Sequence, residues 1–439
     1  MNFETKGDVM EMAAAKNANT ARQIADAHFD FASDFLGLSD SVKAFLKTPF
    51  RVVQVTLPIT MDDGLLQLFA GYRIQHNDLH TPMMGGIRYH PAVDESELAA
   101  LAETTSWKAA LVRIPVGGAM GGVRCDPRFL SKGELRRITQ KYIARIHRVL
   151  GPHEDIPAPD MNTSSEVMAW ILQEYADRHG PNLACVTGKP GYLEGLMNPH
   201  EAASMGAAFV LSKHVNELGH SLKGMKVAVQ GFGRLGSNLA LMLSRQGCEI
   251  VAVSDIYWGI KSRGGAGISI ADLIRHVEES GSVADFPEAE TIDREEVLSS
   301  DSDILISAAM ECTITEENAR KIKARFVVEA ANMPTCSGAD EVLEENGITV
   351  LPDILVNAGS LIGAYLEWTR NQGAQNHGNP ELETDKRLAA AYTEVMKRAV
   401  DKGLSLKKAA YTIALERMAA EGAKHNNWRS RAAWTGGGQ

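Results

Sequence analysis

One short segment near the middle of the chain restricts the fold more than any other. Residues 226–230 have the apolar character of a buried parallel strand, and the sequence GFGRLG at 231–236 follows at once. A helix is expected through 238–245, and a second strand at 249–254 ends at Asp255. Strand, glycine turn, helix and strand in this order form a βαβ unit, so a parallel sheet of the Rossmann type is expected here.

The glycines of this turn have separate roles in a dinucleotide site. Gly231 permits a tight turn, Gly233 lets the backbone approach a pyrophosphate, and Gly236 lets the helix pack closely on the strand. The helix N-terminus offers N–H groups and the positive end of a dipole to the phosphates. Asp255 is placed to accept both ribose hydroxyls and would repel a 2′-phosphate, so NAD is favoured over NADP. The alternative is a glycine turn that serves packing alone. The predicted cofactor-binding turn also includes Phe232, Arg234 and Leu235.

Composition excludes several classes of partner. The 439 residues are enough for two or three domains of about 150 residues each. A net charge of −10 gives no general attraction to nucleic acid or to an anionic membrane, so neither is expected as a partner. The sequence has no run of about 18 apolar residues that could span a membrane. The first thirty or so residues also lack the apolar centre of a signal peptide.

The cysteine pattern favours a reducing compartment. The five cysteines are odd in number and form no CxxC pair, so neither a disulfide framework nor a zinc ribbon is expected. The histidines show no metal-binding spacing, and no metal is predicted. We therefore expect a cytoplasmic protein without a bound metal.

Hydrophobic periodicity predicts two α/β domains with a cleft between them. We expect a substrate-binding and oligomerisation domain at 1–190, the dinucleotide-binding domain at 191–380, and C-terminal helices at 381–439 that pack back across the cleft. Residues 111–115 are expected to form a short strand leading into a glycine turn at 117–122. The other expected elements are two helices within 8–48, a hairpin of strands 52–58 and 65–74, helices 95–108, 131–150 and 199–218, and strands 155–157, 303–306, 326–329 and 349–351.

Short motifs in both halves of the chain occur in a fixed order. They are MGGIR at 84–88, WK at 107–108, GGAMGG at 117–122, PAPD at 157–160, TGKP at 187–190, the glycine turn, EAAN at 329–332 and NAG at 357–359. In this order they resemble the glutamate/leucine/phenylalanine/valine dehydrogenase family, most closely its hexameric glutamate dehydrogenase branch. The resemblance implies oxidative deamination of an L-amino acid with a nicotinamide cofactor, giving a 2-oxo acid and ammonia. It also implies a homo-oligomer of the hexameric type.

The resemblance assigns roles to several residues. Lys108 would bind the substrate α-carboxylate, and the alternative is a surface lysine at a helix end. Asp160 would carry protons for the departing amine, as a carboxylate in a closed, dry cleft can; the alternative is a structural acid after a proline-rich turn. Asn332 would hold the nicotinamide amide, and Asn357 begins a segment that faces the substrate. The nicotinamide site would be lined by Ala308 and Ala309.

Other positions depart from the family pattern toward lower polarity. Met84 stands where the glutamate-specific members have the lysine that pairs with the substrate side-chain carboxylate. Ala364 stands where they have an assisting serine, so Met84, Leu361 and Ala364 would form an apolar pocket. A carboxylate buried there without a partner would cost on the order of several kcal/mol, so glutamate is disfavoured as substrate. Arg113 replaces a small residue, and it either supplies a charge to the substrate site or faces solvent.

Met120 is the most consequential departure. The family lysine at this position polarises the reacting centre, and a methionine has neither a proton nor a charge to offer. Contributions of this kind are worth about 10²–10⁴ in rate. We therefore consider an NAD-dependent amino-acid dehydrogenase with an altered, more apolar substrate. The alternative is a catalytically silent paralogue, a regulatory subunit or a sensor of NAD and amino acid with a catalytic partner, which Met333 in place of a family glycine also favours. Ordinary glutamate dehydrogenase activity is the less favoured reading.

Overall fold

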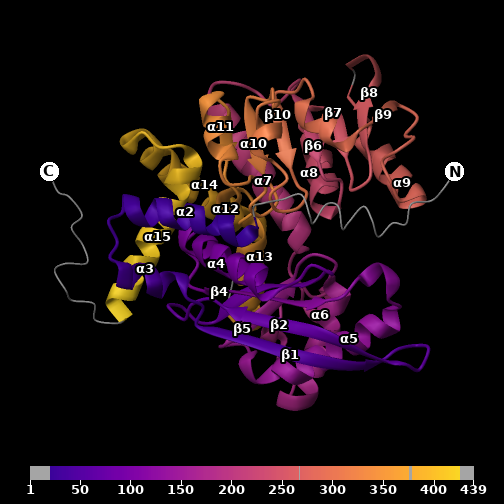
Figure 1. The fold of residues 1–439 in the computed structure, drawn as a ribbon, viewed down its shortest axis with the longest axis vertical. Helices are drawn as coiled ribbons and strands as arrows, with labels where there is room; N and C mark the ends of the chain where they lie inside the picture. The colour runs from indigo at the N-terminus through magenta and orange to yellow at the C-terminus, as the bar shows by residue number, and fades with distance from the viewer. Residues whose placement is uncertain (1–19, 266, 375–377, 426–439) are drawn as a thin grey trace.

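The computed structural model describes residues 20–265, 267–374 and 378–425, which form two α/β domains (Figure 1). The N-terminal domain is built on a five-stranded sheet in the order β1-β2-β4-β3-β5. Strands β1, β2 and β4 pair antiparallel, whereas β3 pairs parallel with both β4 and β5. The strands are β1 (Arg51–Thr60), β2 (Leu66–Gln75), β3 (Met83–Tyr89), β4 (Gly117–Arg124) and β5 (Asp155–Pro159). The predicted hairpin at 52–74 is confirmed by β1 and β2.

Helices cover both faces of this sheet at close range. A Cβ atom at Gly118 of β4 would lie 2.2 Å from the carbonyl oxygen of Ala102, which belongs to α4 (Glu95–Leu111). A Cβ atom at Gly121 would lie 2.7 Å from the hydroxyl of Tyr142 in α5 (Lys132–Ile146), so α5 lies on the opposite face. The capping box of Ser131 and Glu134 fixes the start of α5, close to its predicted start. The domain is completed by α6 (Ser165–His179).

The expected strand at 111–115 and the glycine turn at 117–122 are wrong. The chain turns at 112–116, and the glycine-rich segment is the inner strand β4. The physical reason is that glycines serve close packing as well as turns: only a residue without Cβ lets α4 come this near to β4. Strand β3, which carries the MGGIR motif, was not predicted either.

The C-terminal domain is a seven-stranded sheet in the order β12-β11-β10-β6-β7-β8-β9. The strands from β12 to β7 are parallel, and β8 and β9 extend the sheet antiparallel. The predicted βαβ unit is confirmed as β6 (Lys226–Gln230), α8 (Arg234–Arg245) and β7 (Glu249–Ser254). The predicted strands near 304, 326 and 349 are confirmed as β10 (Ile304–Ser307), β11 (Phe326–Glu329) and β12 (Thr349–Leu351). Strands β8 (Gly259–Ser262) and β9 (Ala289–Ile292) and helix α9 (Ile270–Ser280) were not predicted.

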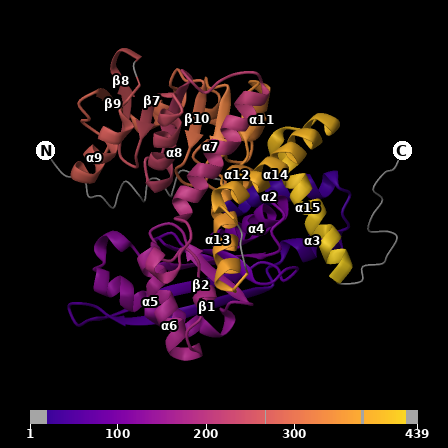
Figure 2. The same cartoon turned by 180° about the vertical axis from the view of Figure 1, so that it is seen from behind.

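Helices from both ends of the chain pack together beside the two sheets. The N-terminal helices α2 (Ala21–Phe35) and α3 (Asp40–Lys47) lie next to α15 (Leu406–His425) in both views (Figures 1 and 2). Helix α15 also contacts α4 and so joins the C-terminal end of the chain to the N-terminal domain. The remaining helices are α7 (Pro199–Glu217), α10 (Glu316–Ala319), α11 (Ala339–Glu345), α12 (Asp353–Val356), α13 (Gly359–Asn371) and α14 (Pro380–Lys402).

A buried carboxylate holds the segment that connects the two domains. Glu367 of α13 accepts hydrogen bonds from the backbone N–H groups of Gly188 (3.2 Å) and Leu196 (3.0 Å). The Lys189 Nζ atom donates to the same carboxylate at 2.6 Å, and both side chains of this ion pair are almost completely buried. Charge-assisted bonds without competing water are strong, so the connection is fixed to α13 near both of its ends.

Candidate functional site

The face of the N-terminal sheet that packs on α4 carries Met84 and Met120, two of the predicted site residues. Met84 of β3 pairs with Gly118 of β4 in parallel register, and Gly118 faces α4. Alternate residues of a strand share one face, so Met84 and Met120 lie on this face together. Met84 is 1% exposed and Met120 is 3% exposed, and both belong to the same hydrophobic core cluster. The floor of the site is therefore thioether and glycine, without a charge at either position.

Asp160 approaches this floor because a glycine leaves room for it. A Cβ atom at Gly86 would lie 2.6 Å from the Asp160 Cβ atom. The backbone N–H of Asp160 donates to Thr163 Oγ1 at 2.8 Å, and Asp160 Oδ2 accepts from Arg88 Nε at 2.7 Å. The position of the carboxylate is thus determined by β3, by the turn after β5 and by one arginine.

Lys108 contacts an asparagine of the other domain, which a second asparagine also contacts. Its Nζ atom donates to Asn332 Oδ1 at 3.2 Å, and Asn357 Nδ2 donates to the same oxygen at 3.0 Å. Burial lowers the pKa of Lys108 to about 8, while the carboxylates of Asp353 and Asp160 act in the opposite direction. The buried Asn357 Oδ1 atom has no hydrogen-bond partner among the described residues, so it can accept a hydrogen bond from a ligand.

The remaining predicted substrate residues divide into two groups. Leu361 of α13 is 7% exposed and belongs to the core cluster that contains Met84 and Met120, and Ala364 follows one helical turn later and is half-buried. Arg113 is not brought to the site. Its side chain is 66% exposed and pairs with Glu394 of α14 at 2.7 Å, which corresponds to the solvent-facing alternative.

The glycine turn has the space and the donors that a pyrophosphate needs. Gly231 has a φ of +93°, and a Cβ atom there would lie 2.6 Å from the carbonyl oxygen of Ala308. Nothing lies within 4 Å of a Cβ atom built on Gly233, which is the N-cap of α8 and makes no side-chain cap. The free N–H groups of α8 therefore face open space, which fits a dinucleotide. Of the other predicted residues here, Phe232 and Gly236 are buried, Leu235 and Ala309 are half-buried, and Arg234 is exposed.

Asp255 is engaged by its own surroundings. One carboxylate oxygen accepts from the backbone N–H groups of Tyr257 and Trp258, both at 2.7 Å. The other accepts from Ser282 Oγ at 2.7 Å and from the backbone N–H of Val283 at 2.8 Å. Two oxygens offer about four acceptor positions, so a ribose hydroxyl would share or replace one of these bonds.

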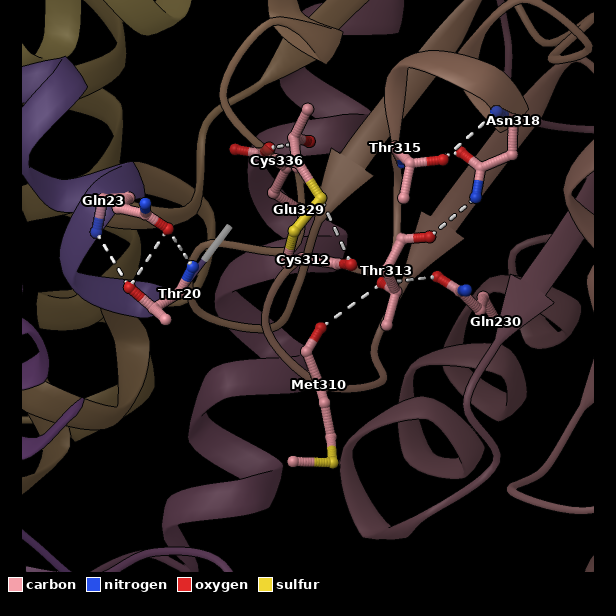
Figure 3. The surroundings of a disulfide bond; sticks show 11 residues. Thr20, Gln23, Gln230, Met310, Cys312, Thr313, Thr315, Asn318, Glu329 and Cys336 are labelled. Atoms are coloured by element: carbon pink, nitrogen blue, oxygen red, sulfur yellow. Dashed lines mark hydrogen bonds between the residues drawn. A yellow bond between two sulfur atoms is a disulfide. The ribbon is translucent and has the colours of Figure 1, made fainter. Parts of the chain in front are cut away.

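A disulfide joins the two loops that follow β10 and β11. Cys312 lies three residues after Ala309, Cys336 lies four residues after Asn332, and their sulfur atoms are bonded (Figure 3). The N–H of Cys312 also donates to the carbonyl oxygen of Met333 at 2.9 Å. No disulfide framework was expected from the sequence, and this single bond was not anticipated, because strand order brings together two residues that carry no pairing signal in sequence. Cys125, Cys185 and Cys248 are free and buried.

An open cavity of about 430 Å³ lies between the domains. It is lined from the N-terminal side by Pro159 and Ser164, and from the C-terminal side by His200 and Arg234. It thus connects the Asp160 turn with the start of α8. Within the described ranges, no group of three or more His, Cys, Asp or Glu side chains could hold a metal ion, and no helix is long and apolar enough to cross a membrane.

Comparison with known proteins decides the family. Residues 195–425 match the family described as glutamate/leucine/phenylalanine/valine dehydrogenase, and residues 49–177 match its dimerisation domain. This chain belongs to the glutamate/leucine/phenylalanine/valine dehydrogenase family. The recognition from sequence motifs and the predicted two-domain fold are both confirmed.

Individual relatives support the same assignment. The chain is 40% identical to the glutamate dehydrogenase of Thermotoga maritima over 401 residues, which cover 90% of this chain and 96% of the relative. It resembles the hetero-hexameric glutamate dehydrogenase of Thermus thermophilus in its leucine-bound form, with 32% identity, a TM-score of 0.85 and coverage of 95% and 97%. The glutamate dehydrogenase of Peptoniphilus asaccharolyticus matches with 30% identity, a TM-score of 0.77 and coverage of 93% and 100%.

Two residues near the site were missed by sequence reasoning. Arg88 holds Asp160, and Glu311 reaches Arg88 from the C-terminal domain. Arg88 lies inside the MGGIR motif and could have been considered, because an arginine between apolar residues of a strand needs a partner. The sequence around Glu311 does not indicate a functional role, because its partner Arg88 lies 223 residues away along the chain.

Proposed function

We propose that this family member is an NAD-dependent amino-acid dehydrogenase that acts on a substrate with an apolar side chain. The observation that carries the proposal is the pair of buried methionines, Met84 and Met120, on the site floor. Glutamate would place a second carboxylate against thioether and glycine, at a cost of several kcal/mol or so. A branched or straight aliphatic side chain would instead gain about 25 cal/mol for each Å² of apolar surface removed from water.

The polar end of the substrate has suitable partners. Lys108 in its protonated form supplies the charge for an α-carboxylate, and Asn332 already orients its Nζ atom. The unpaired Asn357 Oδ1 atom can accept from an amino group or from the amide of a bound nicotinamide. The Asp160 carboxylate would take a proton from the amine, a step that needs a base within hydrogen-bond reach.

The same proposal names NAD as cofactor. When bound, NAD supplies the hydride acceptor. The residues that would hold it are the turn at 231–236, Asp255, the loop with Ala308 and Ala309, and Asn332. The half-buried Asp255 carboxylate disfavours a 2′-phosphate at the adenosine end. A hexamer completes the proposal, in keeping with the hetero-hexameric relative.

A second candidate is a subunit without catalytic activity of its own. It is favoured by Met120, which removes a charged group from the reacting centre, and by the buried Met333 in the loop of Asn332. The Thermus thermophilus relative forms a hetero-hexamer and was captured with leucine. In this alternative the apolar pocket binds an amino acid as a signal, and the turnover occurs on a partner chain.

One experiment separates these functions. Purified protein is assayed by NADH absorbance against a panel of L-amino acids that includes glutamate, and in reverse against 2-oxo acids with ammonia. Calorimetry on the same preparation measures the binding of NAD and of each amino acid. Turnover of an aliphatic substrate above that of glutamate supports the main proposal. Binding without turnover supports the silent subunit, and a preference for glutamate overturns both.

A further inference from the structure

Arg88 is the meeting point of three carboxylates from three parts of the chain. Its Nε atom donates to Asp160 Oδ2 at 2.7 Å. Its Nη1 atom donates to Glu97 Oε1 at 2.5 Å and to Glu311 Oε1 at 3.1 Å. The Arg88 side chain is only 3% exposed, whereas those of Glu97, Glu311 and Asp160 are 18%, 13% and 23% exposed. The guanidinium is therefore the least hydrated member of the cluster and depends on these partners.

The three contacts differ in what they connect. Arg88 on β3, Glu97 in the first turn of α4 and Asp160 after β5 all belong to the N-terminal domain. Glu311 follows β10 and belongs to the nucleotide-binding domain. The Glu311 contact can therefore exist only while the two domains are close together, whereas the contacts with Glu97 and Asp160 do not depend on their separation.

Glu311 is held firmly on its own side. The neighbouring Cys312 donates its N–H to the Met333 carbonyl oxygen at 2.9 Å and is bonded to Cys336 (Figure 3). The loop that carries Glu311 therefore moves with the loop that carries Asn332. Asn332 contacts Lys108 across the same cleft.

The Asp160 side chain depends on Arg88 for its direction. The backbone N–H of Asp160 donates to Thr163, whereas the Asp160 carboxylate accepts a hydrogen bond from Arg88 Nε. A planar guanidinium presents its N–H groups in a fixed fork. A partner bound at Nη1 therefore limits how the plane can turn and so where Nε points.

We propose that Arg88 is a positioning residue that couples domain closure to the placement of Asp160. Glu311 arrives with the nucleotide-binding domain and adds a second acceptor to the Nη1 atom that Glu97 already binds, which further restricts the plane that directs Nε at Asp160. The carboxylate is then set in place when the cleft is closed over its ligands. The inference rests on the proposed function only in that Asp160 is taken as the proton-carrying residue.

The test measures closure, and it needs no turnover. Spin labels are attached at Lys132→Cys and Arg275→Cys, one in each domain, since both native side chains are largely exposed and the native free cysteines are buried. Labelled protein is diluted into unlabelled protein, and the distance distribution is recorded by pulsed electron spin resonance with saturating NADH. The closed fraction is compared among Glu311→Gln, Glu97→Gln, Asp160→Asn and the Asp160→Asn/Glu311→Gln pair.

The proposal predicts a specific pattern. Glu311→Gln lowers the closed-to-open ratio at least threefold, whereas Glu97→Gln, which neutralises the other carboxylate at the same Nη1 atom within one domain, leaves it nearly unchanged. The Asp160→Asn and Glu311→Gln effects are coupled by at least threefold in a double-mutant cycle. The matched control Glu317→Gln removes an exposed carboxylate of the same domain, and its effect adds to that of Asp160→Asn.

Two outcomes would overturn the proposal. One is an equal effect of Glu97→Gln and Glu311→Gln on the closed fraction, and the other is strict additivity of Glu311→Gln with Asp160→Asn.

Activity and cofactor binding give two further readouts. If the panel assay finds a substrate, Glu311→Gln lowers kcat with little change in the calorimetric Kd for NADH, and Arg88→Lys retains more activity than Arg88→Gln. If NADH fails to bind by calorimetry, the proposed function fails. The cycle repeated without NADH then still decides whether Glu311 and Asp160 are coupled.

Discussion

At the scale of single residues, the proposed departure from a glutamate-specific site rests on two methionines. Met84 and Met120 lie on one face of the sheet and are almost completely buried. Methionine is flexible enough to fill the volume of a lysine side chain without its charge. Under the proposed function, the chain would keep the shape of the floor while it changes what the floor can bind.

Restoring the two charges tests this view. We expect Met84→Lys combined with Met120→Lys to raise NADH formation from glutamate by about 10²-fold or more, because groups of this kind contribute about 10²–10⁴ in rate. Each single variant serves as a control and should gain much less. No gain in a double variant that still binds NAD would mean that another position, such as Ala364 or Met333, blocks glutamate.

Lys108 gives a pH dependence with a defined sign. Burial brings its pKa to about 8, so the ammonium that binds a carboxylate is present below this pH and is lost above it. We expect the calorimetric affinity for a 2-oxo acid to be flat near pH 6.5 and to fall by up to about tenfold for each pH unit above the pKa of Lys108 in the free protein, about 8. Lys108→Met should bind weakly at every pH. An unchanged slope in Lys108→Met would assign the titration to another group.

At the scale of elements, the glycine-rich strand shows where sequence reasoning reached its limit. The turn at 231–236 was predicted correctly because its strand, helix and glycines are neighbours in sequence. Strand β4 was missed because its glycines admit α4, a partner that only the folded chain reveals. The Arg88 cluster was missed for the same reason, since its partners lie 9, 72 and 223 residues away. Lys108, Asn332 and Asn357 were named from family motifs, and the folded chain brings them into hydrogen-bond contact.

The packing role of β4 can be measured directly. We expect Gly118→Ala to lower the free energy of unfolding by about 3 kcal/mol or more, because the added methyl would lie 2.2 Å from a backbone oxygen that cannot move freely. The control is Gly133→Ala in α5, where the closest atom lies at 3.5 Å and alanine is the better helix former. Urea unfolding of both variants gives the comparison, and a tolerated Gly118→Ala would show that α4 can shift away from β4.

At the scale of the whole molecule, the disulfide links two loops of the nucleotide-binding domain that meet the other domain across the cleft. It closes a segment with a sequence separation of 24 residues, and cross-links of this length stabilise by about 3 kcal/mol in the chain-entropy model. We expect the double variant Cys312→Ser/Cys336→Ser to have a free energy of unfolding that is lower by about 3 kcal/mol, as measured by urea unfolding. Reductant should lower the stability of the unaltered chain in the same way and leave the variant unaffected. A count of five free thiols in the unfolded, non-reduced protein would contradict the assignment.

The anchored connection between the domains has a mechanical consequence. Glu367 accepts hydrogen bonds from Gly188 and Leu196, near both ends of the connection, so the connection is held in one position against α13. A connection held in this way acts as a hinge, which allows rotation of one domain about it and resists translation. We therefore expect the domains to move by rotation about this connection and not by sliding along each other, so that each closure brings the same atoms together.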